Sequence, residues 1–450
     1  MGTVGINFGA ASSGQGFDVA STVTAIIASQ QAIESPWKSQ LASLQAQDTV
    51  FTTLGTDLST LTTALQSLTD FNGVLAEKQG ASSDTNVLAL TSAIAASVGG
   101  SHTIVVTALA QTSSEYTDTI ANGADTLSGS VTIQGHTITV DSSSNTLASL
   151  AGAINLAGIG VNASIITDVS GSRLSLVSGS SGSAGQLAIT SSLTDATTST
   201  AIGFNTGQTG QDASLTVDGV SLKSASNTVS SAIPGVTFQL LALSTSPVQV
   251  QITNDTSAVG IAVGNVVAAY NAVVKDLNGQ EGKDASGNAK PLYGSTTLAS
   301  LQNQLSGALL GGAASGSIQS ITQLGIGFNQ DGTLSLNADN LNTALNNNFS
   351  DVIGFLQNSG SFGQSFASTL NNLGTQSTKG ILYLAQQQNS AQEASLNFNI
   401  SNQDALLATE KTNLTTELNT ANQILQSIPA QLNQVDEMYS AVTGYNTGSR

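Results

Sequence analysis

The feature that most constrains this sequence is a heptad repeat of apolar residues near its C-terminal end. Its members advance by four and three residues in strict alternation, an average of about 3.5 residues per apolar position. That period is typical of the narrow contact line of a coiled coil, whereas an ordinary surface helix has a broader apolar face. The repeat comprises Leu414, Leu418, Ala421, Leu425, Ile428, Leu432, Val435, Tyr439 and Val442.

A second segment near the other end of the chain has the same alternation of three and four. It comprises Phe51, Leu54, Leu58, Leu61, Leu65 and Leu68. Either segment alone could be a core helix of a globular domain, but sustained heptads at both ends favour a stalk. We therefore predict that the two chain ends lie side by side, antiparallel, as a coiled coil.

Polar and proline residues interrupt the C-terminal repeat. Pro429 lies inside it, where the missing N–H and the ring clash cost about 3 kcal/mol or kink the helix. The sequence therefore predicts a bend or two helical segments there. Asp404 and Lys411 fall on the upstream continuation of the repeat, where polar residues often fix the register of a coiled coil.

Between the two heptad segments the pattern changes to a period of two, which indicates β-strands. Asp218-Gly219 and Gln134-Gly135 each separate two alternating runs and predict hairpins. The expected fold is multidomain α+β, with β-rich head domains nested between the terminal helices. We expect a coiled-coil stalk (1–35 and 400–450), a mainly helical leg domain (36–72 and 255–399), a β-rich head domain (73–112 and 211–254) and an inserted β-rich outer domain (113–210).

The charge of the chain is low and acidic. Only 8% of its residues are Asp, Glu, Lys or Arg, and the net charge is -18, which argues against nucleic-acid binding. Cysteine is absent, so disulfides and cysteine metal sites are excluded. The first sixteen residues lack a basic residue and an apolar run, so we expect no cleaved signal peptide. The most apolar run, 258–274, contains Asn265 and Asn271, and we expect no membrane insertion.

No group of residues has the pattern of a catalytic or cofactor site. Residues 158–163 (GIGVNA) fit a loose dinucleotide fingerprint, but a predicted helix precedes them and a strand follows, the reverse of the required order. His102 and His136 lie on separate predicted strands. Asp284 begins a calcium-like spacing that lacks the glycine and glutamate of an EF-hand. We predict a protein that is not an enzyme and needs no metal or cofactor.

Several stretches of the sequence, taken in order, form a recognisable set. They are 16–23 (GFDVASTV), 215–220 (LTVDGV), 226–229 (SNTV), 233–240 (IPGVTFQL), 269–274 (AYNAVV), 292–298 (LYGSTTL) and 324–336 (LGIGFNQDGTLSL). A further stretch, 129–190, has its core at 150–155 (LAGAIN), 160–164 (GVNAS) and 173–176 (RLSL). Together they resemble the bacterial flagellar filament-capping family, also called hook-associated protein 2, and residues 129–190 resemble a repeat inserted in flagellins and hook-associated proteins. The order and spacing of the stretches, more than any one of them, make the resemblance specific.

The resemblance implies a cap at the distal end of the flagellar filament that guides exported flagellin into the lattice and prevents its loss. It also implies a ring of identical copies, most often five, and contacts with flagellin and with the hook-filament junction proteins. An export chaperone at the C-terminus and passage through the flagellar type III channel to the extracellular tip belong to the same expectation.

The residues leave a rival interpretation open. A β-rich module with many Ser, Thr and Asn residues on a coiled-coil stem also suits a secreted adhesin that binds host or surface glycans. Matching helices at both ends favour the cap, because many stalked adhesins need only one anchoring end. A β-helix lyase would require a regular repeat and clustered carboxylates or arginines, and neither is present.

Overall fold

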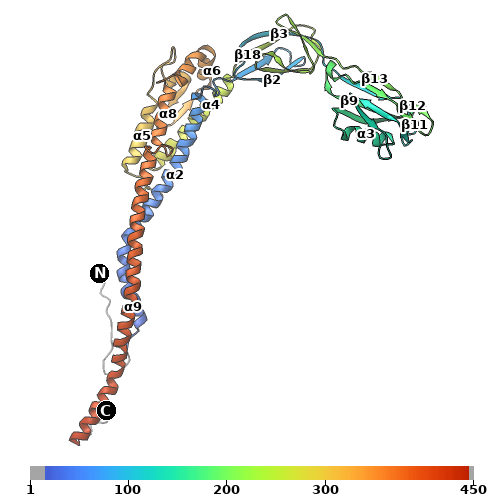
Figure 1. Cartoon of the computed structure of the whole chain (residues 1–450). Helices are drawn as coiled ribbons and strands as arrows, with labels where there is room; N and C mark the ends of the chain where they lie inside the picture. Colours follow the sequence, from blue (N-terminus) through green and yellow to red (C-terminus); the bar gives the residue numbers. More distant parts are fainter. Residues whose placement is uncertain (1–15, 445–450) are drawn as a thin grey trace. The chain divides into compact units, whose positions relative to one another are not determined.

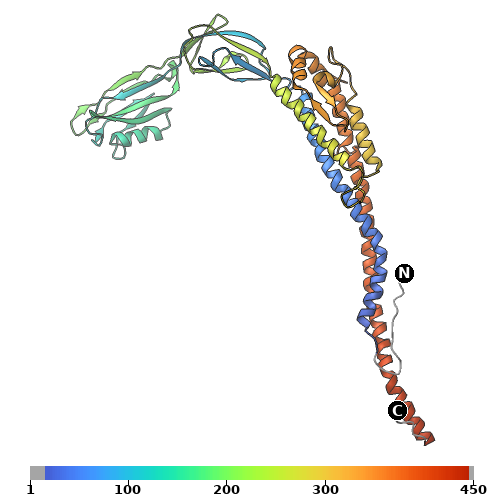
Figure 2. The same ribbon diagram turned by 180° about the vertical axis from the view of Figure 1, so that it is seen from behind.

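The computed structural model describes residues 16–444, which divide into two compact units. One unit combines Met1–Gln66 with Val263–Arg450, and the other is Ser67–Ala262. Helices dominate the first unit, and several β-sheets with one short helix make up most of the second (Figures 1 and 2). The predicted α+β class is confirmed at this level. The first fifteen and last six residues of the predicted stalk lie outside the described part of the chain.

The helical unit begins with two consecutive helices, α1 (Val19–Gln31) and α2 (Ser35–Thr69), separated by a short 3-10 turn at Ala32–Glu34. Asp18 caps α1, its carboxylate accepting a hydrogen bond from Ser21 N at 3.1 Å. Pro36 lies in the first turn of α2, where the absence of an N–H costs little. The remaining elements are α4 (Thr256–Gly279), α5 (Thr296–Ala308), a 3-10 turn (Ile321–Leu324), the hairpin β19 (Ile326–Phe328) and β20 (Leu334–Leu336), α6 (Ala338–Asn347), α7 (Phe349–Gln357), α8 (Phe362–Leu373) and α9 (Ile381–Thr443).

The last helix, α9, is continuous through Pro429. The prediction of two helical segments at that position is therefore wrong. Pro429 has no N–H to donate to the carbonyl of Leu425, so one helical hydrogen bond is missing. The helix nevertheless continues from Ile381 through the proline to Thr443. A long helix tolerates the loss of one such hydrogen bond. Leu425 is half-buried, so water can bind its free carbonyl.

The β unit contains a sandwich of two sheets that share one core. The five-stranded sheet has the order β1-β18-β3-β14-β15, and the three-stranded sheet has the order β16-β17-β2. Buried side chains of both sheets, among them Ile104, Val250 and Phe238, belong to the same hydrophobic cluster. The strands are β1 (Lys78–Ser82), β2 (Leu88–Ala93), β3 (Gly100–Ala108), β14 (Ala213–Val217), β15 (Val220–Ser224), β16 (Thr228–Ile233), β17 (Val236–Leu240) and β18 (Val248–Asn254).

A second β-rich part lies within the same unit and has its own hydrophobic core. Leu150 and Ile154 of α3 (Leu147–Leu156) share that core with Leu174 and Leu176. The chain enters and leaves it between β3 and β14, where Gln111 and Gln211 form an antiparallel bridge. Its strands are β4 (Thr112–Thr117), β5 (Leu127–Ser128), β6 (Ser130–Ile133), β7 (His136–Thr139), β8 (Val161–Asp168), β9 (Gly171–Ser181), β10 (Ile189–Ser191), β11 (Thr194–Asp195), β12 (Thr200–Ala201) and β13 (Phe204–Gln208), with a 3-10 turn at Ser183–Gly185.

Both hairpins predicted from turn dipeptides are confirmed. Asp218 and Gly219 connect β14 to β15, and Gln134 and Gly135 connect β6 to β7. All four turn residues have a positive φ, between 51° and 83°, as the two-residue turns of twisted hairpins require.

Candidate assembly interface

The N-terminal heptad segment is buried, and all of it except Leu68 belongs to the helical unit. All six of its predicted seam residues on α2 are at most 3% exposed. Leu54 and Leu58 line a common space with Val273 of α4, Leu305 of α5 and Leu373 of α8. These leucines therefore form the core of a bundle of several helices rather than the contact line of a two-helix coil.

Helix α9 lies beside α2 and α1 in the opposite direction, as its hydrogen bonds to them show. Gln376, which precedes α9, contacts Ser59, and Gln386 contacts Thr52, both through side chains. Further along, Glu410 accepts a hydrogen bond from Gln30 at 2.8 Å, and the Asn422 side chain accepts one from Phe17 N at 2.9 Å. Residue numbers fall on one side as they rise on the other, so the helices are antiparallel (Figure 1).

One buried polar residue of α9 escaped the sequence analysis. Asn389 is 7% exposed and lies seven residues after Leu382 and seven before Leu396, both of which are buried. It therefore occupies a seam position, where its amide donates a hydrogen bond to the Asp48 carboxylate of α2 at 2.8 Å. A polar residue at such a position fixes the register of two helices. The available signal was its seven-residue spacing from two leucines.

The predicted register residues, Asp404 and Lys411, are both exposed on α9. They border an open groove of about 320 Å³ between α1 and α9, with Ile27 and Leu407 also in its lining. The structure thus places them beside the seam, and Asn389 inside it.

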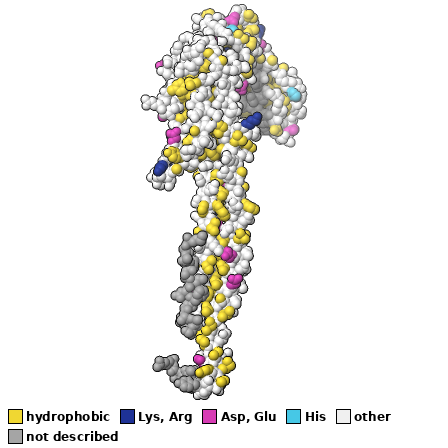
Figure 3. Space-filling view, turned by 90° about the vertical axis from the view of Figure 1, so that its left-hand side faces the viewer, with side chains coloured by type: hydrophobic (Ala, Val, Ile, Leu, Met, Phe, Trp, Pro, Cys, Tyr) yellow, Lys and Arg dark blue, Asp and Glu magenta, His cyan; other side chains and the backbone are white. Residues whose placement is uncertain are grey.

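The C-terminal heptad segment is progressively less covered along α9. Leu407 is buried, and Leu414, Leu418, Leu425 and Ile428 are half-buried. Beyond Pro429, Leu432 and Val435 are 49% and 55% exposed. Figure 3 shows hydrophobic side chains following the length of the helices. The structure therefore does not bring the residues at 414–435 together with those at 51–68.

Two carboxylates of the helical unit lie close enough to perturb each other. Asp57 of α2 and Asp276 of α4 are both half-buried. Burial, followed by the hydrogen bond and the charge of Asp276, raises the pKa of Asp57 to about 6. The pair therefore shares a proton below that pH and repels above it. Neither carboxylate was singled out by the sequence analysis.

The turn between α1 and α2 contains another buried acidic residue. Glu34 is completely buried, and its carboxylate accepts a hydrogen bond from the Lys38 ammonium group at 2.7 Å. That bond raises the pKa of Lys38. The ion pair spans one helical turn and fixes the first turn of α2.

The residues that were considered as catalytic or metal-binding candidates are either exposed or hydrogen-bonded within strands and turns. The His102 Nδ1 atom lies 2.7 Å from one carboxylate oxygen of Asp218. The other oxygen of the same carboxylate accepts a hydrogen bond from the Thr103 N–H. His136 is exposed on β7. Asp284 accepts the backbone N–H groups of Ser286 and Asn288 in a tight turn. Within residues 16–444 no group of three potential ligands could hold a metal ion.

One described helix, α4, is long and apolar enough to cross a membrane by length and composition. It has 24 residues, more than the apolar run in the sequence indicated. Its side chains at Tyr270, Val273 and Leu277 are buried in the helical unit, which is the environment of a core helix.

The antiparallel terminal helices and the β-sheets between them define a multidomain α+β protein, and two family profiles identify its family. The profile for the C-terminus of flagellar hook-associated protein 2 matches residues 210–443, and the profile for its N-terminus matches residues 15–113. The chain belongs to the flagellar hook-associated protein 2 family.

Relatives in other bacteria agree with this family. The B-type flagellar hook-associated protein 2 of Pseudomonas aeruginosa is 33% identical over 70% of this chain and 74% of its own length. The flagellar hook-associated protein 2 of Escherichia coli O157:H7 is 30% identical over 75% of this chain and 78% of its own length.

A solved structure has a similar fold. The crystal structure of the D1-D2-D3 domains of the flagellar cap protein FliD from Escherichia coli has a TM-score of 0.58 and 29% sequence identity. It covers 76% of this chain and 99% of the solved chain. The relatives carry flagellar names, which favour a cap over an adhesin.

Proposed function

We propose that this protein caps the distal end of the bacterial flagellar filament and promotes the ordered incorporation of exported flagellin. Its membership of the hook-associated protein 2 family and its similarity to a flagellar cap protein carry this conclusion. The cap is structural: its action requires binding to the filament end and to flagellin, and the family is not known as an enzyme family.

The terminal helices are, in this proposal, an antiparallel coiled coil that holds the filament end. The hydrogen bonds from Gln30 to Glu410 and from Phe17 to Asn422 support the pairing, and the seven-residue spacing around Asn389 supports its register. The seam beyond Pro429 would be buried against other subunits, because exposed apolar stripes mark interaction surfaces.

The proposed domains follow the sequence boundaries: stalk, helical leg, head (73–112 with 211–254) and outer domain (113–210). Two separate hydrophobic cores in the β unit support the division between head and outer domain. The two compact units divide at residues 66 and 262, a few residues from the proposed boundaries between leg and head at 72 and 254.

The partners we propose are further copies of the chain, which form a ring of five, together with flagellin and the hook-filament junction proteins. Export through the flagellar type III channel, and a chaperone that shields the C-terminal seam before export, complete the proposal. A free apolar stripe on α9 at Leu432 and Val435 supports the need for such a chaperone.

The deciding experiment places charges on the uncovered part of the seam. We expect Leu432→Asp with Val435→Asp to abolish filament growth in cells that lack the native protein, while thermal unfolding of the purified chain is unchanged. Both side chains are already exposed, so the folded chain loses little, whereas an interface would bury two carboxylates.

The matched control is Gln431→Asp with Gln434→Asp, which adds the same charge at the same spacing on exposed residues of α9 outside the apolar seam. This control should support filament growth. Normal growth in the seam variant would refute the proposed role of the seam. Equal failure of both variants would point to charge alone.

A further inference from the structure

A cavity of about 160 Å³ lies within the helical unit, between α4, α5 and the turn of the β19–β20 hairpin. A cavity of about this size accommodates a single aromatic ring. It is separate from the apolar seam of α9 and serves no step of the proposed cap function. Val274, Leu277 and Leu305 supply apolar lining.

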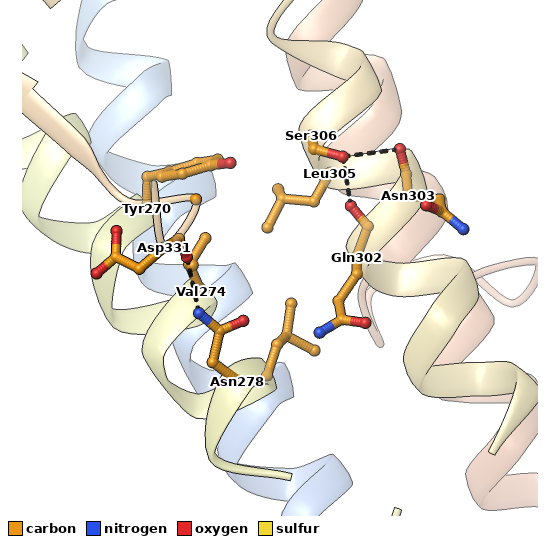
Figure 4. A pocket seen from close by; sticks show the side chains of 10 residues that line it. Tyr270, Val274, Asn278, Gln302, Asn303, Leu305, Ser306 and Asp331 are labelled. Carbon is orange, nitrogen blue, oxygen red and sulfur yellow. Dashed lines mark hydrogen bonds between the residues drawn. The ribbon is translucent and has the colours of Figure 1, made fainter. Parts of the chain in front are cut away.

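A tyrosine hydroxyl without a partner faces this cavity. Tyr270 is 2% exposed, and it extends from α4 toward Leu305 and Ser306 on the opposite wall (Figure 4). No described residue forms a hydrogen bond with its hydroxyl, although buried tyrosine hydroxyls usually have one. Burial raises the pKa of Tyr270 to about 12, so the group is a neutral donor and acceptor at physiological pH.

The walls of the cavity are held in place by two asparagines of α4. Asn278 donates a hydrogen bond to the Asp331 carbonyl at 2.8 Å, and Asn271 donates one to the Leu334 carbonyl at 2.8 Å. The second asparagine also accepts the Leu334 N–H. These bonds fasten the hairpin to α4, so the cavity exists before any ligand arrives and binding requires little reorganisation.

Two polar side chains of the opposite wall form hydrogen bonds within the chain. Ser306 donates to the Gln302 carbonyl at 2.7 Å, and the Gln302 amide donates to Glu281 at 2.7 Å. The Tyr270 hydroxyl has no hydrogen bond to a described residue, so a molecule in the cavity can bind to it without breaking a bond within the chain. Asp331 also lines the cavity, and its carboxylate already accepts two hydrogen bonds from Thr333. A charged ligand would lose hydration among Val274, Leu277 and Leu305, so a neutral one is favoured.

We propose that this cavity binds a small neutral molecule with one ring and one hydroxyl or carbonyl oxygen, which forms a hydrogen bond with Tyr270. The ring would lie against the apolar lining, and its oxygen would complete the hydrogen bonding of the tyrosine. The site is a property of the folded leg and does not depend on the role in the filament.

Phenol and benzene are the matched probes, since they differ by one hydroxyl. Titration of the purified full chain, followed by ligand-observed NMR, should show saturable phenol binding with a Kd on the order of 1 mM. Benzene should bind about tenfold more weakly, because it leaves the tyrosine unpaired. Equal affinity for both, or saturable binding of neither, would overturn the proposal, the second result meaning a cavity that holds water.

Two variants separate the hydrogen bond from the space. Tyr270→Phe should bind phenol about tenfold more weakly than the native chain and should lose the preference over benzene. Val274→Phe should fill the cavity and abolish the binding of both probes. Ser306→Phe fills it from the other wall if Val274→Phe lowers the melting temperature. Phenol binding that survives in both filled variants would place the ligand elsewhere and refute the site.

Discussion

The two heptad segments have the same sequence period but opposite environments. The leucines of α2 are enclosed by α4, α5 and α8, whereas Leu432 and Val435 of α9 are about half exposed. A heptad period therefore identifies residues that need a helical partner, but it does not say whether that partner belongs to the same chain. The segment with internal partners contributes to the stability of the fold, and the segment without them is available for assembly.

The largest expected effect tests the buried half of this comparison. Leu54→Ala should lower the free energy of unfolding by about 2–5 kcal/mol, because Leu54 is fully buried and its removal leaves a cavity among several helices. Leu432→Ala on α9 is the matched control and should change it by less than about 0.5 kcal/mol. Chemical denaturation followed by circular dichroism measures both. Similar losses for the two variants would show that both segments are already packed within one chain.

The next prediction concerns the continuity of the exposed segment. Pro429→Ala restores a backbone hydrogen bond and removes a residue that costs a helix interior about 3 kcal/mol. We expect slower amide hydrogen exchange around residue 429, with no shift in global unfolding, because this part of α9 has few contacts within the chain. Ala430→Gly, at an exposed neighbour, should have the opposite effect on exchange. Unchanged exchange in Pro429→Ala would mean that the proline does not limit the helix.

Sequence periodicity predicted the elements whose residues repeat most regularly. The turn dipeptides at Asp218 and Gln134 located two hairpins, and the heptads located α2 and α9. Helix α8 was not predicted, although its sequence carried the signal. Its large buried residues recur at intervals of four, four and three, the period of an amphipathic helix: Phe362, Phe366, Leu370 and Leu373. The break at Pro429 was overestimated because a local propensity is a weak guide within a long helix.

The candidate site was predictable in part for a similar reason. The period marked the apolar seam residues and also included Asn389, but only the structure shows that Asp48 lies opposite and accepts its hydrogen bond. The Asp57 and Asp276 carboxylates are 219 positions apart in sequence, and only the packing of α2 against α4 makes them neighbours. Pairs that depend on tertiary contacts have no signal in a single sequence.

The register of α9 against α2 can be tested through its buried amide. Asn389→Ala should lower the free energy of unfolding by about 1–3 kcal/mol, since it leaves the Asp48 carboxylate without its donor in a partly buried position. Gln388→Ala is the matched control on an exposed neighbour and should have little effect. An unchanged stability in Asn389→Ala would mean that solvent replaces the amide at Asp48.

The smallest expected effect depends on pH and tests the packing of α2 against α4. The pKa of Asp57 is about 6, above its unfolded value, so the folded chain binds this proton more tightly. Its contribution to stability is therefore greatest at low pH and falls as the pH rises through about 6. Asp276→Asn should raise the free energy of unfolding at pH 8 by on the order of 1 kcal/mol, after screening by solvent, and should change little at pH 4. Asp404→Asn, at an exposed site on α9, should show no such difference between the two pH values. A gain of equal size at both pH values would show that Asp276 acts through packing rather than through its charge.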